Sequence, residues 1–311
     1  MTLLLLDRTQ TTAALDPTAL LPLLRQTLVA ICREEVSAPA RIAALSPAGL
    51  LGAMPAYVPG LGMAAKLASV FAVPGGTAHR GVVLLVDEVT GEPLTLMDAE
   101  PVTALRTAAT ATIAMQALAR PDASRIAVIG AGAQARAQLQ MLDAIGSVAS
   151  IVLASRSPER AALAVDGHLQ ASTASTVREA VDGADVVFCC TDAVAAVIQH
   201  SWLSSGAHVS SVGGSHGPEL DVETVAQGSL FVEWTGAVTA KPAAGAHELQ
   251  GIDPLRVGVL GAVLDGQHPG RRSPGELTVY KATGHAALDV AAAVAVHARA
   301  RELRLGAYVD L

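Results

Sequence analysis

A glycine-rich turn between a predicted strand and a predicted helix carries the sharpest chemical signal in the sequence. A short apolar run, residues 125–129, leads directly into Gly130-Ala131-Gly132-Ala133-Gln134-Ala135. The first glycine permits a tight turn, the second lets the backbone approach a pyrophosphate, and the alanine in third place still permits close packing of the helix on the strand. The amino end of the helix offers N–H groups to phosphate oxygens. In this strand–turn–helix context the pattern predicts dinucleotide binding by residues 130–134.

The end of the next predicted strand, residues 150–154, indicates which dinucleotide binds. A site for NAD typically has an acidic residue there, which binds the ribose 2′-hydroxyl. This chain has Ser155, Arg156 and Ser157 instead, and Arg160 follows one turn later. A cation and hydroxyls suit a 2′-phosphate, so we expect NADPH. NADH is the alternative if Arg156 only stacks on the adenine.

Three further residues are candidates for this cofactor site or for the substrate site. Thr191 follows the predicted strand 185–190, at the carboxyl edge where open α/β sheets bind ligands, and either lines the cofactor site or is a turn residue. The chain has only three lysines, Lys66, Lys241 and Lys281. Lys66 stands among apolar residues, and a lysine is a compact charge that can titrate. Lys281 is expected either near the nicotinamide or paired with a carboxylate.

The elements that must position these residues change character after Arg106. Before it, a predicted helix over 17–33 and strands over 63–73, 80–86 and 94–97 indicate an antiparallel layer, with residues 1–6 as a strand or its lead-in. After a helix over 107–119, apolar strands alternate with helices, which predicts a parallel sheet covered on both faces. These alternating segments are 125–129, 133–144, 150–154, 158–165, 177–181, 185–190, 208–212 and 230–234. A final helix is predicted over 283–304.

Composition excludes several classes of protein. With 51% hydrophobic and 16% charged residues, the chain is not disordered. A long uncharged run, residues 42–65, contains three prolines and four glycines, so it does not predict a membrane-spanning helix. The net charge of −7 argues against a nucleic-acid partner. Cys32, Cys189 and Cys190 show no metal spacing, so we expect free thiols in the cytoplasm and no metal.

Several stretches, in this order along the chain, resemble the ornithine cyclodeaminase/mu-crystallin family. The most specific is Arg106-Thr-Ala-Ala, about twenty residues before the glycine turn. The others are Gly62-Met-Ala-Ala-Lys66, Gly81-Val-Val-Leu-Leu-Val-Asp87, Gly91-Glu-Pro-Leu-Thr-Leu-Met-Asp98 and Lys281-Ala-Thr-Gly284 followed by Asp289. The resemblance implies a Rossmann-type doubly wound parallel sheet over 107–283. It also implies a discontinuous α+β substrate and dimerisation domain over 1–106 and 284–311, a homodimer, and a substrate cleft between the two domains.

The resemblance also assigns site residues. Arg41, Lys66 and Arg106 match the family's cations for the substrate carboxylate, and Thr107 is implied to bind the cofactor. Charge-assisted bonds from two arginines and a lysine would neutralise such a carboxylate.

One departure from the family pattern concerns the reaction. Cyclodeaminases carry an aspartate followed by a Pro-Gly-Lys run after the fifth Rossmann strand, whereas this chain has Ser215 at that position and no such lysine. The resemblance therefore favours the ketimine reductase branch, which reduces Δ1-pyrroline-2-carboxylate or Δ1-piperideine-2-carboxylate to L-proline or L-pipecolate. His216, Ser215 and Lys66 are the candidate catalytic residues that supply the proton. His216 could equally be a loop histidine that points at solvent.

Two other classes of function stay open at this point. One is an enzyme of another reaction type, an ornithine cyclodeaminase or an alanine-type amino acid dehydrogenase. The other is a non-catalytic, NADPH-dependent protein that binds a small ligand, as the mu-crystallin resemblance allows. Each class retains an amino-acid-like ligand, because all three carboxylate cations are present.

Overall fold

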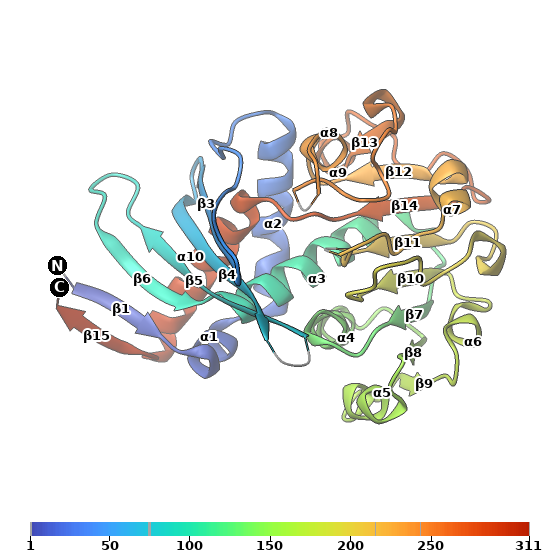
Figure 1. The fold of residues 1–311 in the computed structure, drawn as a ribbon, viewed down its shortest axis with the longest axis horizontal. Helices are drawn as coiled ribbons and strands as arrows, with labels where there is room; N and C mark the ends of the chain where they lie inside the picture. Colours follow the sequence, from blue (N-terminus) through green and yellow to red (C-terminus); the bar gives the residue numbers. More distant parts are fainter. Residues whose placement is uncertain (1, 74–75, 215, 243, 311) are drawn as a thin grey trace. The chain divides into compact units, whose positions relative to one another are not determined.

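The computed structural model describes residues 2–73, 76–214, 216–242 and 244–310, and the chain divides into two compact units (Figure 1). Unit 1 consists of residues 1–106 and 285–311, and unit 2 consists of residues 107–284. The sequence places the second boundary one residue earlier. Ser215 lies outside the described residues.

A mixed sheet forms unit 1, with strand order β15-β1-β6-β5-β4-β3-β2. Neighbouring strands are antiparallel except β1 and β6, which are parallel. The two ends of the chain meet in this sheet, since Thr2 pairs with Asp310 (Figure 1). The strands are β1 (Thr2–Leu6), β2 (Ile42–Ser46), β3 (Gly49–Val58), β4 (Gly62–Val73), β5 (Gly76–Val86), β6 (Pro93–Asp98) and β15 (Ala307–Asp310).

Helices α1 (Arg8–Ala14), α2 (Pro17–Cys32) and α10 (Ala286–Leu303) complete unit 1. Helix α10 contacts both α1 and α2 and packs on β3, β4 and β5.

The side chains of β4 point alternately to the two faces of the sheet, as in any strand, and one of these faces is covered. Ala64 and Lys66 are buried, whereas Met63 and Leu67 are exposed. The strand period therefore places the lysine on the covered side.

Unit 2 contains a parallel sheet with strand order β13-β12-β14-β11-β10-β7-β8-β9. Its strands are β7 (Arg125–Ile129), β8 (Ser150–Ala154), β9 (Ala171–Thr173), β10 (Val186–Cys189), β11 (His208–Ser211), β12 (Ser229–Val232), β13 (Val257–Val259) and β14 (Thr278–Lys281). Its α-helices are α4 (Ala133–Ile145), α5 (Pro158–Val165), α6 (Val177–Val181), α7 (Val222–Gln227), α8 (Gly236–Thr239) and α9 (Leu260–Leu264). Short 3-10 turns lie at His200–Trp202 and Pro254–Arg256.

The predicted doubly wound Rossmann-type sheet is confirmed. From β7 the chain first builds β8 and β9 on one side and then crosses to β10 and β11 on the other. The order therefore reverses between β7 and β10, and ligands of such sheets bind at the carboxyl ends of the strands beside this switch point. The apolar strands are buried on both faces; in β10 all four residues are buried.

Two local differences from the sequence prediction have physical reasons. The helix predicted to begin at Thr107 is α3 (Ala99–Leu118), which begins eight residues earlier. Pro101 does not prevent this start, because it lies in the first turn, where the N–H that proline lacks would have no partner within the helix. The uncharged run 42–65 forms β2, β3 and the start of β4. Pro55 is tolerated in β3 because pairing with β2 ends at Ala53, so this residue has a strand neighbour only in β4.

Within the described residues, no helix is long and apolar enough to cross a membrane.

Cys189 and Cys190 carry free thiols and are buried, and burial raises the pKa of both thiols. They are therefore poor nucleophiles, in keeping with a structural role. The expected location in the cytoplasm stays a prediction.

Candidate functional site

The glycine turn has the geometry that a dinucleotide needs. Gly130 adopts a φ of +116°, and a Cβ at this position would meet the carbonyl oxygen of Cys190 at 2.5 Å. Only glycine therefore fits between the ends of β7 and β10. Gly132 is the N-cap of α4 and makes no side-chain capping bond. Ala135 is fully buried, which lets helix and strand pack closely.

Open space lies at the start of α4. A Cβ added to Gly132 would have no atom of the described residues within 4 Å, apart from atoms of Gly132 itself and of the two residues beside it in the chain. The buried side-chain oxygen Oε1 of Gln134 accepts no hydrogen bond from the described part of the chain. Ribose hydroxyls can donate to such an oxygen, and phosphate oxygens can accept from the backbone N–H groups of the helix start. Residues 130–134 thus lie together as the sequence predicts, and their contact with a cofactor stays a prediction.

The end of β8 presents a mixed set of groups. Arg156 and Arg160 are exposed, and Ser155 and Ser157 are half-buried. The Ser157 hydroxyl caps α5 by accepting from the Arg160 backbone N–H at 3.2 Å and donates to the Glu159 carboxylate at 2.8 Å. The structure thus gives Ser157 a capping role that the sequence did not consider. Glu159 adds a negative charge beside the place predicted for a 2′-phosphate.

A buried carboxylate joins the carboxyl ends of β10 and β11. Glu219 Oε1 accepts from the backbone N–H and the hydroxyl of Thr191, at 2.7 and 2.6 Å. Its Oε2 accepts from the Ser211 hydroxyl and the Gly213 N–H, at 2.7 and 2.8 Å. Burial raises the pKa of Glu219, although Lys281 and these hydrogen bonds lower it. Thr191 is therefore fixed in place at the switch point, where the sequence predicts it.

Lys281, at the end of β14, is buried in the same network. Its Nζ donates to Ser211 Oγ at 2.8 Å and to the Gly213 carbonyl at 2.9 Å, and lies 3.1 Å from Glu248 Oε1. Of the two roles considered from the sequence, the structure provides the ion pair with a carboxylate. A direct contact with the nicotinamide stays a prediction.

His216 lies in the loop after β11 and is paired with an acid. Its Nδ1 is 2.6 Å from Asp192 Oδ1, and 39% of its side chain is exposed. A carboxylate at Nδ1 favours the proton on that nitrogen and orients the ring. Asp192 thus holds the His216 ring in place, its exposure fits the loop histidine considered as the alternative, and a role in proton transfer stays a prediction.

Unit 1 contains a compact buried charge cluster, which we call the cation cluster: Lys66, Arg106 and Asp289. Lys66 Nζ lies 2.7 Å from Asp289 Oδ2, and Arg106 Nε lies 3.0 Å from Asp289 Oδ1. All three side chains are more than nine-tenths buried. They come from β4, α3 and α10, so three segments far apart in sequence converge. The structure thereby brings together two of the three cations that the family resemblance assigns to a substrate carboxylate.

Arg41 and His285 interact electrostatically with the cation cluster. Burial lowers the pKa of Lys66, Asp289 raises it, and Arg106 and Arg41 lower it again; the net effect is a lowered pKa. Burial raises the pKa of Asp289, but Lys66 and Arg106 outweigh it and hold the pKa below its ordinary value of 3.8. Burial lowers the pKa of His285 to about 4, with Asp289, Arg41 and Arg106 as further influences. Half-buried Arg41 therefore influences the same charges, and its contact with a substrate carboxylate stays a prediction.

Sequence reasoning gave no role to three residues of these networks. Asp289 served only as a marker of the family, and neither Glu219 nor His285 had a role. A buried Lys or Arg needs a partner, so the search for an acid to match Lys66 was the signal that could have found Asp289. No such signal existed for His285, which caps α10 by accepting from the Ala287 N–H.

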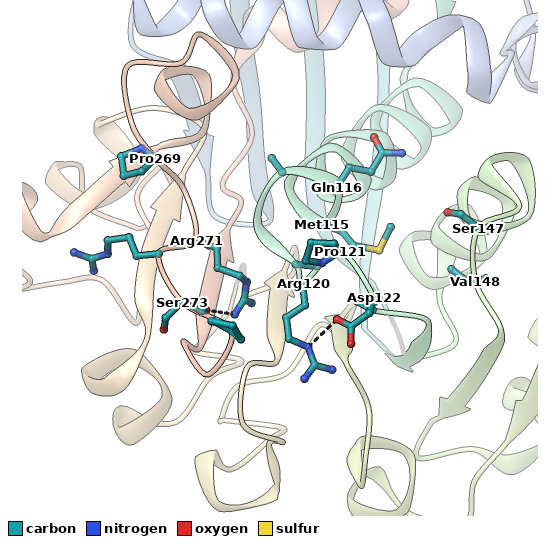
Figure 2. A pocket seen from close by; sticks show the side chains of 15 residues that line it. Met115, Gln116, Arg120, Pro121, Asp122, Ser147, Val148, Pro269, Arg271 and Ser273 are labelled. Atoms are coloured by element: carbon teal, nitrogen blue, oxygen red, sulfur yellow. Dashed lines mark hydrogen bonds and ion pairs between the residues drawn. The ribbon is translucent and has the colours of Figure 1, made fainter.

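A pocket of about 860 Å³ lies elsewhere in unit 2 (Figure 2). Its lining segments, 115–123, 147–148 and 269–274, include those that enter β7, β8 and β14, so the pocket lies at the amino ends of the strands, opposite the edge that binds dinucleotides. Arg271 in its wall donates to the carbonyls of Leu118, Ala207 and Glu276 and thus fastens the wall. None of the predicted site residues lines this pocket.

Metal binding finds no support in the described part of the chain. No group of three or more His, Cys, Asp or Glu side chains there is arranged to hold an ion. The absence of a metal from the reaction stays a prediction.

Comparison with known proteins extends these observations. A model of the ornithine cyclodeaminase/mu-crystallin family matches residues 4–304. The chain is 34% identical over 258 residues to the ketimine reductase mu-crystallin of Mus musculus, with 80% of each chain covered.

Two solved structures share the fold. One is the Δ1-pyrroline-2-carboxylate reductase of Thermococcus litoralis in complex with NADH and L-proline, with a TM-score of 0.89, 26% identity, and 98% of this chain and 100% of that chain covered. The other is an archaeal alanine dehydrogenase dimer with bound NAD, with a TM-score of 0.85, 26% identity and 100% of both chains covered.

Proposed function

Because the chain belongs to the ornithine cyclodeaminase/mu-crystallin family and is an oxidoreductase, we propose that it uses NADPH to reduce a cyclic ketimine carboxylate. The substrate is Δ1-pyrroline-2-carboxylate, Δ1-piperideine-2-carboxylate or both, and the products are L-proline and L-pipecolate. The named activity of the mouse and Thermococcus relatives supports this choice.

The cation cluster carries the proposal. Lys66 and Arg106 bring two positive charges and Asp289 one negative charge, so the buried cluster has an excess of one positive charge. Arg41 adds another positive charge to the same environment. Ammonium and guanidinium groups make charge-assisted hydrogen bonds to carboxylates, so these cations together could hold the single negative charge of a small imino acid. The cluster therefore favours a ligand with a carboxylate next to the reacting carbon.

The residues of the chain have two tasks in this reaction. The cations hold the substrate carboxylate, which orients the imine carbon, and positioning of this kind is a large part of catalysis. The bound cofactor supplies the hydride. As the hydride reaches the C2 carbon, the electron pair of the C=N bond moves to nitrogen, and the nitrogen takes one proton. Lys66, Ser215 and His216 are the proposed sources of that proton; His216 has an aspartate partner at Nδ1.

NADPH rather than NADH is part of the proposal. It rests on Arg156 and Ser155 at the end of β8, where an acidic residue is missing. Two observations favour NADH instead: the two similar structures contain NADH or NAD, and Glu159 adds a negative charge beside the same strand end. A ratio of kcat/KM for NADPH over NADH above ten would support the proposal, and a ratio below one would reverse it.

A homodimer is also proposed. Strands β2, β3 and β4 expose large apolar side chains, namely Ile42, Leu45, Leu51, Met63, Leu67 and Phe71. Clustered apolar side chains on one sheet typically mark a protein interface. The archaeal alanine dehydrogenase is described as a dimer, which supports the same state here. Sedimentation of the purified chain as a monomer at micromolar concentration would contradict it.

The test of the reaction is direct. Purified protein is mixed with NADPH and each cyclic imine, and the absorbance of the reduced cofactor is followed. Oxidation that depends on the imine supports the proposal, and its absence with both ring sizes refutes it. The similarity to an alanine dehydrogenase gives a second candidate, which predicts NAD reduction with L-alanine. Ammonia release from ornithine would indicate a cyclodeaminase, and ligand binding without any turnover would indicate the binding protein.

A further inference from the structure

Asp289 is an acid for which the proposed reaction has no direct use, and it is the most buried member of the cation cluster. Only 1% of the residue is exposed. Each of its oxygens faces a different cation: Oδ2 faces Lys66 Nζ at 2.7 Å, and Oδ1 faces Arg106 Nε at 3.0 Å. The carboxylate therefore bridges β4 and α3 from its place on α10. Without it, the two cations would repel each other in a poorly solvated place.

We propose that Asp289 is the positioning residue of the carboxylate site: it fixes the two cations at one separation and offsets one of their charges, so that a monoanionic imino acid binds. This inference rests on the proposed function. Asp289 touches the cations and acts on substrate only through them. An acid that held the unit together and did nothing else would affect stability alone.

The groups around Lys66 determine the pH dependence that follows. They are Asp289 and His285 on α10, Arg106 on α3, and Arg41 in the segment before β2. His285 stays neutral above about pH 4, because burial lowers its pKa to about 4. Lys66 has a lowered pKa, so its loss of a proton as the pH rises is the change in charge that concerns the carboxylate site.

Loss of the Asp289 charge has a predictable direction. Asp289 raises the pKa of Lys66, so an uncharged residue in its place leaves burial and the two arginines to lower that pKa further. Lys66 then loses its proton at a lower pH, and the KM for the imine begins to rise at a lower pH. A weakened charge-assisted bond also raises KM at neutral pH by about tenfold or more.

The experiment compares Asp289→Asn, Asp289→Glu and wild type. Glu302→Gln is the matched control, because Glu302 lies on the same helix in an exposed pair with Arg299. For each protein, the KM and kcat for Δ1-pyrroline-2-carboxylate are measured from pH 6 to 10, together with the dissociation constant of NADPH from its fluorescence. Asp289→Asn is expected to raise KM about tenfold, to shift its alkaline rise to lower pH, and to leave the dissociation constant of NADPH within about threefold. Asp289→Glu is expected to raise KM but to keep the alkaline rise near that of wild type.

Unchanged KM and pH profile in a folded Asp289→Asn protein would overturn the inference, and so would an equal loss of NADPH affinity. If that variant does not fold, Asp289→Glu decides alone, since it retains the charge but displaces it: KM must rise while the alkaline limb stays near that of wild type.

Failure of the proposed function has a separate signature. Wild type would then oxidise no NADPH with either imine. In that case the binding of pyrrole-2-carboxylate, a planar carboxylate probe, is measured by calorimetry. Weaker binding to Asp289→Asn than to wild type supports the inference, and equal binding or no binding to either protein overturns it.

Discussion

The fully buried His208 predicts how unit 2 responds to acid. Its Nδ1 lies 3.0 Å from Thr278 Oγ1, and its Nε2 lies 2.9 Å from Ser210 Oγ. The Thr278 hydroxyl donates to the Leu118 carbonyl, so it accepts from His208, and the neutral ring carries its proton on Nδ1. Burial, together with the nearby Arg271, lowers the pKa of His208 from 6.5 to about 3.

The magnitude follows from this shift. Between pH 6.5 and about 3 the unfolded chain binds a proton at this histidine and the folded chain does not, so the free energy of unfolding decreases as pH falls. At pH 5 the loss from His208 alone, relative to pH 7, is about 2 kcal/mol.

The assay is urea unfolding of wild type and of His208→Asn at pH 7 and pH 5, with His79→Asn as the control at an exposed histidine. Asparagine retains a donor and an acceptor but does not titrate. The variant is expected to be less stable at pH 7, yet to lose about 2 kcal/mol less than wild type when the pH is lowered. An equal loss in both proteins would refute the idea that the fold holds His208 neutral.

Three other substitutions test the cofactor half of the chain. Gly130→Ala places a Cβ 2.5 Å from the carbonyl oxygen of Cys190, at a residue whose φ is +116°. The dissociation constant of NADPH, measured by fluorescence, should therefore rise about tenfold or more. An unchanged constant would contradict the role assigned to this turn. Arg156→Asp should shift the ratio of kcat/KM from NADPH toward NADH, and an unaltered ratio would remove Arg156 as the selecting residue. Glu219→Gln leaves Lys281 with less counter-charge and should lower the free energy of unfolding by about 3 kcal/mol; a loss below about 1 kcal/mol would show that Glu248 suffices.

Local signals were enough to predict the cofactor half of the fold. The glycine turn, the strand before it and the helix after it depend on neighbours within about fifteen residues, and β7, α4 and β8 lie where the sequence predicts them. The same holds for α5, whose Ser157-Pro158 start is a helix signal in itself.

Long-range pairing was beyond the reach of such signals. The contact of Lys66 with Asp289 joins residues 223 positions apart, and no periodicity encodes it. Glu219 is another example, because its role depends on Thr191 and Ser211 ending neighbouring strands. No strand was predicted over residues 49–58, where Pro55 stands between apolar residues. The structure shows why a strand forms there: pairing with β2 extends only to Ala53, so Pro55 needs no donor toward that side.

The order of the segments along the chain determines when the cation cluster can form during synthesis. Unit 2 is one continuous segment, residues 107–284, whereas unit 1 is assembled from segments on both sides of it. Lys66 and Arg106 are therefore synthesised long before Asp289, the acid that pairs with both. Until α10 has emerged from the ribosome, the two cations lack this acid and remain hydrated. The cation cluster can thus be completed and buried only after α10 has been made.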